Sequence, residues 1–203
     1  MKTLKIASLL LSGSLLFAYC STPSGSEPKV YSGEQAQTLK NKGSEAALKA
    51  QQTLLKTVKG AMAEKGVAGA LSYCNLEALG LKAKLGEEMG VEIARRSARY
   101  RNPKDAPENE FEEQLLVAYE QAQKEGKDLN SQIFESETHY IYYQPISIPN
   151  AACLKCHGKP GQDIADADVQ KLAELYPEDK AQNYKLGDFR GAWRIQWAKN
   201  LQE

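Results

Sequence analysis

The sequence lacks a surplus of charge of either sign, because 26 lysine and arginine residues balance 26 aspartate and glutamate residues. The first twenty residues contain two lysines and no acid, which leaves 24 basic against 26 acidic residues in the rest of the chain. A protein that binds nucleic acid normally carries a strong basic surplus that neutralises phosphates. The charge balance therefore excludes the nucleic-acid-binding class.

The N-terminus lacks an apolar run long enough to span a bilayer, which takes about 20 residues. Its apolar stretch, Ile6 to Phe17, follows two lysines and has the length of a secretory signal. We predict a signal peptide over residues 1–20 and export to the periplasm. Either the signal is cleaved near Cys20 to release a free protein, or Cys20 is lipidated as in a bacterial lipoprotein. Tyr19 stands where lipoprotein signals normally have a small residue, and a lipid on Cys20 is the only membrane contact that we expect.

Cysteine and histidine are also scarce, with four and two residues. Apart from Cys20, three cysteines remain, namely Cys74, Cys153 and Cys156. An odd number of cysteines in an exported protein, which enters an oxidising compartment, requires an explanation.

Residues 21–33 form a polar linker, and residues 34–203 have the size of one folded domain. Helical and strand patterns are mixed along this domain. We expect helices over 34–64 and 66–90, a strand over 91–101 and a helix over 108–126. A strand pair over 131–148, a site loop over 153–158, a helix over 166–177 and a terminal strand over 184–199 complete the domain. This order predicts an α+β domain with an antiparallel sheet backed by long N-terminal helices.

The sequence Cys-Leu-Lys-Cys-His at 153–157 is the attachment motif of c-type haem. Its spacing lets two thiols add to the two vinyl groups of the porphyrin, and the adjacent histidine can then supply an axial nitrogen to iron. Three other uses of this motif are weaker. A structural disulfide would not need His157, a thioredoxin-like dithiol expects a βαβ unit, and joint zinc chelation by adjacent Cys156 and His157 is awkward. The motif therefore predicts one covalent haem c.

The second axial position of the iron has few candidates in this sequence. His139 is the only other histidine, and Met62 and Met89 are the only methionines besides the initiator. Cys74 is the one unpaired cysteine, and it lies in an apolar helical stripe with residues such as Leu71, so it should point into the domain. Spacing alone leaves two uses of Cys74 open, as an iron ligand or as a small core residue.

Five segments together resemble the periplasmic single-haem-c proteins with a PAS-like fold. They are "SYCNLEA" around Cys74, "ARRSARYRNPKDAPENEFE", "YYQPI", "CLKCHG" and "GDFRGAWRI". The family is typified by a cyanobacterial haem protein with histidine and cysteine axial ligands. The resemblance implies a PAS-like antiparallel sheet, and it implies that Cys74 is the second axial ligand opposite His157.

A cluster of four arginines follows the predicted N-terminal helices, at Arg95, Arg96, Arg99 and Arg101. A planar guanidinium can bind a carboxylate through two hydrogen bonds, so this cluster is expected to supply partners for the haem propionates. Within the cluster we favour Arg101 for this role.

A haem iron with protein ligands on both sides leaves no free position for a substrate, so we do not expect an enzyme. If the thiolate protonates and leaves on reduction, the iron opens to a diatomic gas. We therefore expect a redox or gas sensor that signals through a partner protein. The alternative is a low-potential periplasmic electron carrier, because thiolate ligation stabilises ferric iron.

Overall fold

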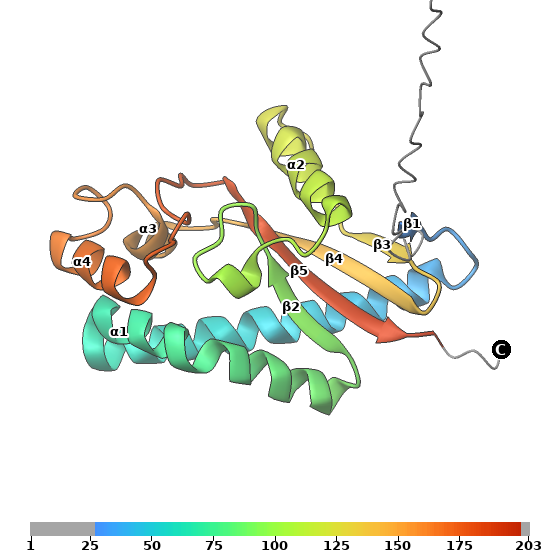
Figure 1. Cartoon of the computed structure of the whole chain (residues 1–203), viewed down its shortest axis with the longest axis horizontal. Helices are drawn as coiled ribbons and strands as arrows, with labels where there is room; N and C mark the ends of the chain where they lie inside the picture. Colours follow the sequence, from blue (N-terminus) through green and yellow to red (C-terminus); the bar gives the residue numbers. More distant parts are fainter. Residues whose placement is uncertain (1–26, 200–203) are drawn as a thin grey trace, which may run out of the picture.

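Helices and strands are interspersed along residues 27–199, which are the part of the chain that the computed structural model describes (Figure 1). In chain order the elements are β1 (Lys29–Val30), α1 (Ala36–Met89), β2 (Glu92–Arg96), the 3₁₀ helix η1 (Pro103–Asp105), α2 (Glu110–Lys124), β3 (Gln132–Glu135), β4 (His139–Ser147), α3 (Ala151–His157), α4 (Asp166–Leu175) and β5 (Phe189–Ala198). This mixture confirms the α+β class. The predicted signal peptide, with Cys20, lies outside the described residues. Within residues 27–199, no helix is long and apolar enough to cross a membrane.

Five strands of the described chain form one antiparallel sheet in the order β1-β3-β4-β5-β2. β3 and β4 form the hairpin that the sequence predicts, with Phe134 opposite Ile141. β5 lies between β4 and β2 and pairs with both. Its side chains alternate between the two faces of the sheet, with Trp193 in the core beneath α1 and Ala192 in the core beneath α2. The predicted terminal strand is therefore confirmed, and it occupies an interior position in the sheet.

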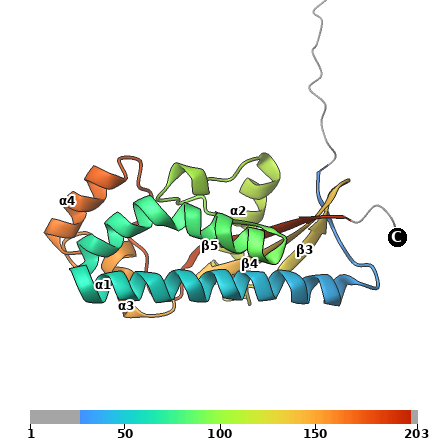
Figure 2. The same ribbon diagram turned by 90° about the horizontal axis from the view of Figure 1, so that it is seen from below.

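Helix α1 is a hairpin of two arms, residues 36–65 and 67–89, that turns at Gly66. The backbone of Gly66 has φ 67° and ψ −170°, a conformation that is essentially restricted to glycine. The two arms run back along each other, and the turn lies at the end of the molecule that carries α3 and α4 (Figure 2). The two helices predicted over 34–64 and 66–90 are therefore correct, and the break between them has a local cause in Gly66.

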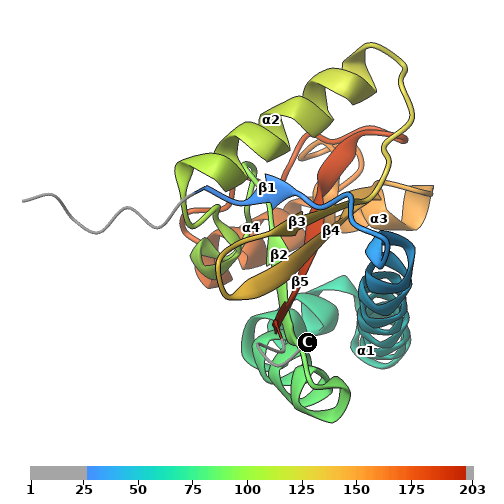
Figure 3. The same cartoon turned by 90° about the vertical axis from the view of Figure 1, so that its right-hand side faces the viewer.

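Helices cover both faces of the sheet, with the arms of α1 on one side and α2 on the other (Figure 3). Beneath α1, small residues such as Ala46 and Ala50 let the helix approach Trp193 and Tyr142 closely. Beneath α2, Leu116 and Tyr119 are buried with side chains of β3 and β4. Full burial of a large apolar side chain contributes about 1.5–3 kcal/mol. These two cores hold the sheet between its helices.

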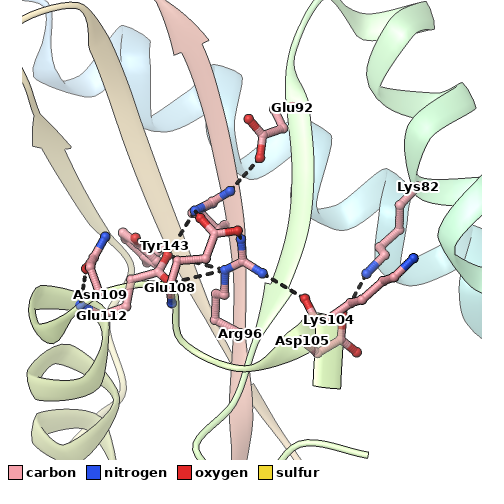
Figure 4. Close-up of polar contacts among 10 residues, drawn as sticks. Lys82, Glu92, Arg96, Lys104, Asp105, Glu108, Asn109, Glu112 and Tyr143 are labelled. Atoms are coloured by element: carbon pink, nitrogen blue, oxygen red, sulfur yellow. Dashed lines mark hydrogen bonds and ion pairs between the residues drawn. The ribbon is translucent and has the colours of Figure 1, made fainter. Parts of the chain in front are cut away.

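A polar network fixes the segment between β2 and α2 to the sheet (Figure 4). Glu112 is almost fully buried and pairs with Arg96 and Arg194, while the hydroxyl of Tyr143 donates to it at 2.8 Å. Asn109 caps α2 by accepting a hydrogen bond from the backbone N–H of Glu112 at 2.9 Å. Arg96 of the same network also donates to the carbonyl of Lys104 in η1, at 3.1 Å, and Lys82 of the second arm pairs with Asp105, so η1 is held against both β2 and α1.

The motif segment is helical, which corrects the expectation of a loop at 153–158. Asn150 begins α3 as an N-cap, because its side-chain oxygen accepts the N–H of Ala152 at 3.0 Å. Only seven residues are helical before Gly158, which is too short to show a helical period in the sequence. The motif therefore sits on a short helix directly after β4.

Candidate functional site

Cys153, Cys156 and His157 lie three and four residues apart on α3, so they share one face of the helix. All three line one cavity of about 250 Å³. The cavity is enclosed by both arms of α1, the end of β4, α3 and the start of β5. Its wall is largely aliphatic, with Leu54, Val58, Leu71, Leu81, Leu85 and Ile148 among the lining residues.

Cys74 lines the same cavity from the second arm of α1, although it lies seventy-nine residues before Cys153. One helical turn earlier, Leu71 is buried in a cluster against which Cys156 packs. Burial raises the pKa of the Cys74 thiol, and the nearby charges of Arg95 and Arg101 oppose that rise. Burial likewise raises the pKa of Cys156 to about 11, Arg101 opposes the rise, and the neighbouring Cys74 adds to it. The fold therefore gathers three sulfurs and His157 around one cavity.

The ring of His157 is oriented by a backbone carbonyl. Its Nδ1 lies 2.8 Å from the oxygen of Ala181, and a carbonyl can only accept a hydrogen bond, so Nδ1 carries the proton. Burial holds the pKa of His157 well below its usual range, and the charges of Arg190 and Arg101 add to this effect. The imidazole is therefore neutral, with the lone pair of Nε2 free. This is the state in which histidine binds a metal, with a partner at the other nitrogen that fixes the ring.

Arg101 also lines the cavity, but its hydrogen bonds go to the protein. Its Nη2 donates to the carbonyls of Cys156 and Ala181, and it pairs with the buried carboxylate of Asp179 at 3.2 Å. Arg101 thereby ties the end of α3 to the loop that orients His157. Its predicted contact with a haem carboxylate stays a prediction, and the structure shows a positioning role for it.

Two charged residues that the sequence alone did not single out, Lys82 and Asp105, form part of the cavity wall together with Arg95 of the predicted arginine cluster. Lys82 from the second arm and Arg95 from β2 both contact Asp105 of η1, at 2.9 and 2.6 Å. Burial of Asp105 opposes its ionisation, but Arg95 and Lys82 outweigh this effect and lower its pKa to about 2. No local pattern marks Lys82 or Asp105, because three separate elements bring the group together.

The remaining candidates for the second axial position occupy different places. His139 is at the start of β4, eight residues before Ser147 at the cavity end, which corresponds to about 27 Å along a strand. Its Nδ1 interacts with the hydroxyl of Thr138 at 2.7 Å. Met62 lines the cavity from the first arm. Met62 and Cys74 are therefore the candidates that the fold places at the cavity.

The alternatives to haem attachment can be compared with the geometry of the described residues. Cys74, Cys153 and Cys156 are all free thiols rather than disulfide partners. Residues 27–199 contain no group of three or more histidine, cysteine, aspartate or glutamate side chains placed to hold a metal ion. The donor set, two helical thiols next to a neutral imidazole in an aliphatic cavity, fits the covalent attachment that the motif predicts. A buried arginine of the wall, Arg190, has an unpaired Nε, which adds an anion-binding group to that fit.

The fold and the site define an α+β protein with a Cys-x-x-Cys-His helix at an aliphatic, cation-lined cavity. The family model described as Tll0287-like matches residues 32–197, so the chain belongs to the Tll0287-like family and the predicted family is confirmed. Among solved structures, the chain is similar to the crystal structure of the cyanobacterial heme-protein Tll0287. The two share 19% identity with a TM-score of 0.57, over 85% of this chain and 100% of that chain. At this identity the similarity shows the fold alone. No curated protein matches this chain.

Proposed function

We propose that this chain carries one covalent haem c, attached through Cys153 and Cys156, with His157 and Cys74 as axial ligands. The observation that carries the proposal is the presence of Cys74 on the wall that Cys153, Cys156 and His157 also line. Motif residues on one short helix lie together in any fold, whereas Cys74 comes from another element. The name of the similar solved structure, a heme-protein, supports the same choice of cofactor.

The bound haem would supply a one-electron redox couple and an iron centre that can take a diatomic ligand. Cys153 and Cys156 would hold the group through two thioethers, each formed by addition of S–H to a vinyl double bond, which requires no oxidant. His157 presents Nε2 while Ala181 holds its Nδ1 proton. Cys74 would hold the iron as the thiolate, because coordination to a metal deprotonates a thiol outright. Arg95 and Arg101 favour that charge in an otherwise aliphatic wall.

We further propose that the haem protein acts as a redox or diatomic-gas sensor. The two proposed axial ligands stand on different elements, His157 on α3 and Cys74 on the second arm of α1. Burial favours the neutral thiol of Cys74, so this side chain would be the one to become protonated and to cease holding the group on its reduction. Loss of this ligand would release the second arm from the cavity, and a partner protein could detect that change. The sheet, with the strands β3-β4-β5-β2 side by side, supports the PAS-like architecture of this proposal.

Expression with a cytochrome c maturation system tests the cofactor. We expect covalent haem, seen as a haemochrome that resists acid–acetone extraction, and we expect its loss when Cys153 and Cys156 are both replaced by alanine. Removal of Cys74 should leave the haem attached. A wild-type protein that acquires no covalent haem under these conditions contradicts the proposal.

Titration of the reduced protein with carbon monoxide separates the two modes of action. A sensor whose Cys74 leaves on reduction should give a CO-bound spectrum at micromolar gas. A reduced protein that never binds CO supports the alternative, a low-potential electron carrier with permanent ligation.

Export to the periplasm, either free or anchored through a lipid on Cys20, completes the proposal. Labelling with a radioactive fatty acid tests the anchor. The wild type should incorporate label and fractionate with membranes, and Cys20→Ser should do neither. An unlabelled wild type in the soluble periplasmic fraction would support the free form.

A further inference from the structure

Arg190, at the start of β5, is a buried arginine that pairs with no carboxylate in the part of the chain that the structure describes. Four arginines are buried in the structure, namely Arg96, Arg101, Arg190 and Arg194. Three of them form ion pairs with carboxylates: Arg96 with Glu108 and Glu112, Arg101 with Asp179, and Arg194 with Glu92, Glu108 and Glu112. Within residues 27–199, Arg190 forms no such pair, although only 5% of its surface is exposed.

The hydrogen bonds of the Arg190 guanidinium leave from one nitrogen. Its Nη1 donates to the hydroxyl of Ser97 at 2.9 Å and to the carbonyl of Arg99 at 3.2 Å. Its Nε is buried and has no hydrogen-bond partner among the described residues. The Nε of Arg194 is also unpaired, but that guanidinium has three glutamates around it. Arg190 therefore has both an unneutralised charge and an unused donor.

A buried guanidinium of this kind destabilises the folded state unless an anion binds to it. Removing an ion from water without a partner of opposite charge destabilises the folded state, and so does a buried donor without an acceptor. The ring of Tyr184, 5.4 Å from the guanidinium carbon, offsets part of this cost. Burial lowers the pKa of Arg190 to about 10, and the like charges of Arg95 and Arg101 add to the effect. Tyr184 and Asp105 oppose this lowering of the pKa, but neither forms an ion pair with Arg190 within residues 27–199.

The local backbone is built to hold Arg190 at the cavity. Ser97 donates its hydroxyl to the carbonyl of Arg190 at 2.9 Å while it accepts from Nη1. The next residue, Gly191, has φ 145°, and an added Cβ would lie 2.4 Å from the carbonyl oxygen of Arg96. Only glycine allows β5 to approach the end of β2 this closely. Arg190 lines the cavity that holds Cys74 and His157.

The ionisable groups that line the cavity favour an anionic ligand. They are the cations Lys59, Lys82, Arg95, Arg101 and Arg190, the single carboxylate Asp105, and the groups Cys74, Cys153, Cys156, His157 and Tyr176. Asp105 already forms ion pairs with Lys82 and Arg95. Asp179, which does not line the cavity, pairs with Arg101. Among the described residues that line the cavity, no carboxylate is left to pair with Arg190, so an external carboxylate can bind it.

We infer that Arg190, rather than Arg101, binds a propionate carboxylate of the haem. This inference rests on the proposed function, because it assigns a residue to the cofactor proposed above. It also replaces the choice of Arg101, whose donors the protein already uses.

Infrared titration of the propionates tests the inference directly. Haem labelled with ¹³C at the propionate carboxyl carbons separates these groups from protein carboxylates. In Arg190→Gln, the acid dissociation constant of one propionate should fall at least tenfold relative to wild type, because an adjacent arginine lowers a carboxyl pKa by about 1–3 units. Loss of this cation should also shift the ferric-to-ferrous ratio at fixed potential about tenfold towards ferric, or about 59 mV.

Arg99→Gln is the matched control. The guanidinium carbon of Arg99 also lies over the ring of Tyr184, at 3.9 Å, but Arg99 donates to the carbonyl of Gln182 and is not among the residues that line the cavity. This variant should leave both propionates as in wild type. Arg190→Lys keeps the charge and should give an intermediate dissociation constant.

Unchanged propionate titration in Arg190→Gln overturns the inference. If that variant does not accumulate, the wild type decides the matter together with Arg190→Lys. Two propionates that titrate in the wild type as ordinary carboxylic acids, at a pKa of about 4–5, and identically in Arg190→Lys, overturn it as well. A wild type without covalent haem contradicts the proposed function first, whereas a haem-loaded wild type with insensitive propionates contradicts only this inference.

Discussion

The carbonyl oxygen of Ala181 accepts from both His157 and Arg101, at 2.8 and 3.2 Å. The backbone N–H of Ala181 donates to Asp179 at 2.8 Å, and Asp179 pairs with Arg101. A closed set of contacts therefore holds the loop, and through it the ring of His157. Orientation of the imidazole depends on residues far from α3 in the sequence.

Arg101→Gln should destabilise the fold strongly, because it leaves the carboxylate of Asp179 buried and unpaired. Breaking one partner of a buried ion pair costs about 3–5 kcal/mol. Urea unfolding at pH 7 measures the change, with Arg99→Gln as a control that should cost about 1–2 kcal/mol. Equal losses in the two variants would contradict the positioning role of Arg101.

The low pKa of Asp105 predicts that the folded protein loses stability in acid. The pKa of this carboxyl is lowered to about 2, so its stabilising contribution is complete above the unfolded pKa of about 3.9 and is lost as pH falls towards 2. The contribution amounts to about 2–3 kcal/mol. Unfolding free energies of wild type and Asp105→Asn should therefore differ by less at pH 2 than at pH 7. A difference that stays constant with pH would contradict the assignment of the low pKa to Asp105.

The arginine cluster at residues 95–101 predicts a partner for a haem carboxylate, which stays a prediction, and the sequence gives no sign of Arg190, the residue inferred above for that role. Arg101 lies in the obvious cluster, yet Asp179 and two carbonyls use its donors. Arg190 is isolated in sequence, and its lack of a carboxylate becomes visible only when all tertiary partners are known. Pairing between side chains that are far apart in the sequence leaves no periodic pattern in the sequence.

Among the elements, the hairpin α1 brings the proposed ligand Cys74 to the cavity. Gly66 reverses the chain at the end where α3 and α4 lie, so the second arm returns past α3. Asn75, next to Cys74, donates to the carbonyl of Leu175 at 3.0 Å and joins this arm to the end of α4. The position of Cys74 thus depends on the turn and on one interhelical hydrogen bond.

Gly66→Ala should cost about 1–3 kcal/mol, because its backbone conformation is strained for any residue with a Cβ. Gly60→Ala is the matched control. Gly60 lies in the helical first arm with open space around an added Cβ, so this change should stabilise the protein by about 0.5–1 kcal/mol. Urea midpoints with unchanged slopes measure both effects. Stabilisation by Gly66→Ala would show that the turn does not require glycine.

Long periodic elements were predictable, and the short motif helix was not. Residues 66–90 show a clear apolar spacing, and the alternation around Trp193 and Ile195 predicts β5. α3 has seven residues, and its helical form depends on the cap at Asn150 and on the packing of Cys153 and Leu154 against Ile148 and Tyr184. Capping and tertiary packing of one turn leave no pattern long enough to detect.

For the whole molecule, the sheet with its two helical layers brings a pair of distant sequence segments to one cavity. α3 follows the end of β4, the central strand, while the second arm of α1 leads into β2, an edge strand that β5 separates from β4. The cavity lies between them, and its cations come from α1, β2, β5 and the loop after β2. The central claim is that Cys74 ligates the iron of a haem attached to α3.

The ferric absorption spectrum of haem-loaded Cys74→Ala tests this claim most directly, with Met62→Leu as the matched control from the opposite arm. Haem should stay attached in both variants, because Cys153 and Cys156 are intact. The Soret and charge-transfer bands should change in Cys74→Ala, and they should match wild type in Met62→Leu. A Cys74→Ala spectrum identical to wild type, or a change confined to Met62→Leu, would contradict ligation by Cys74.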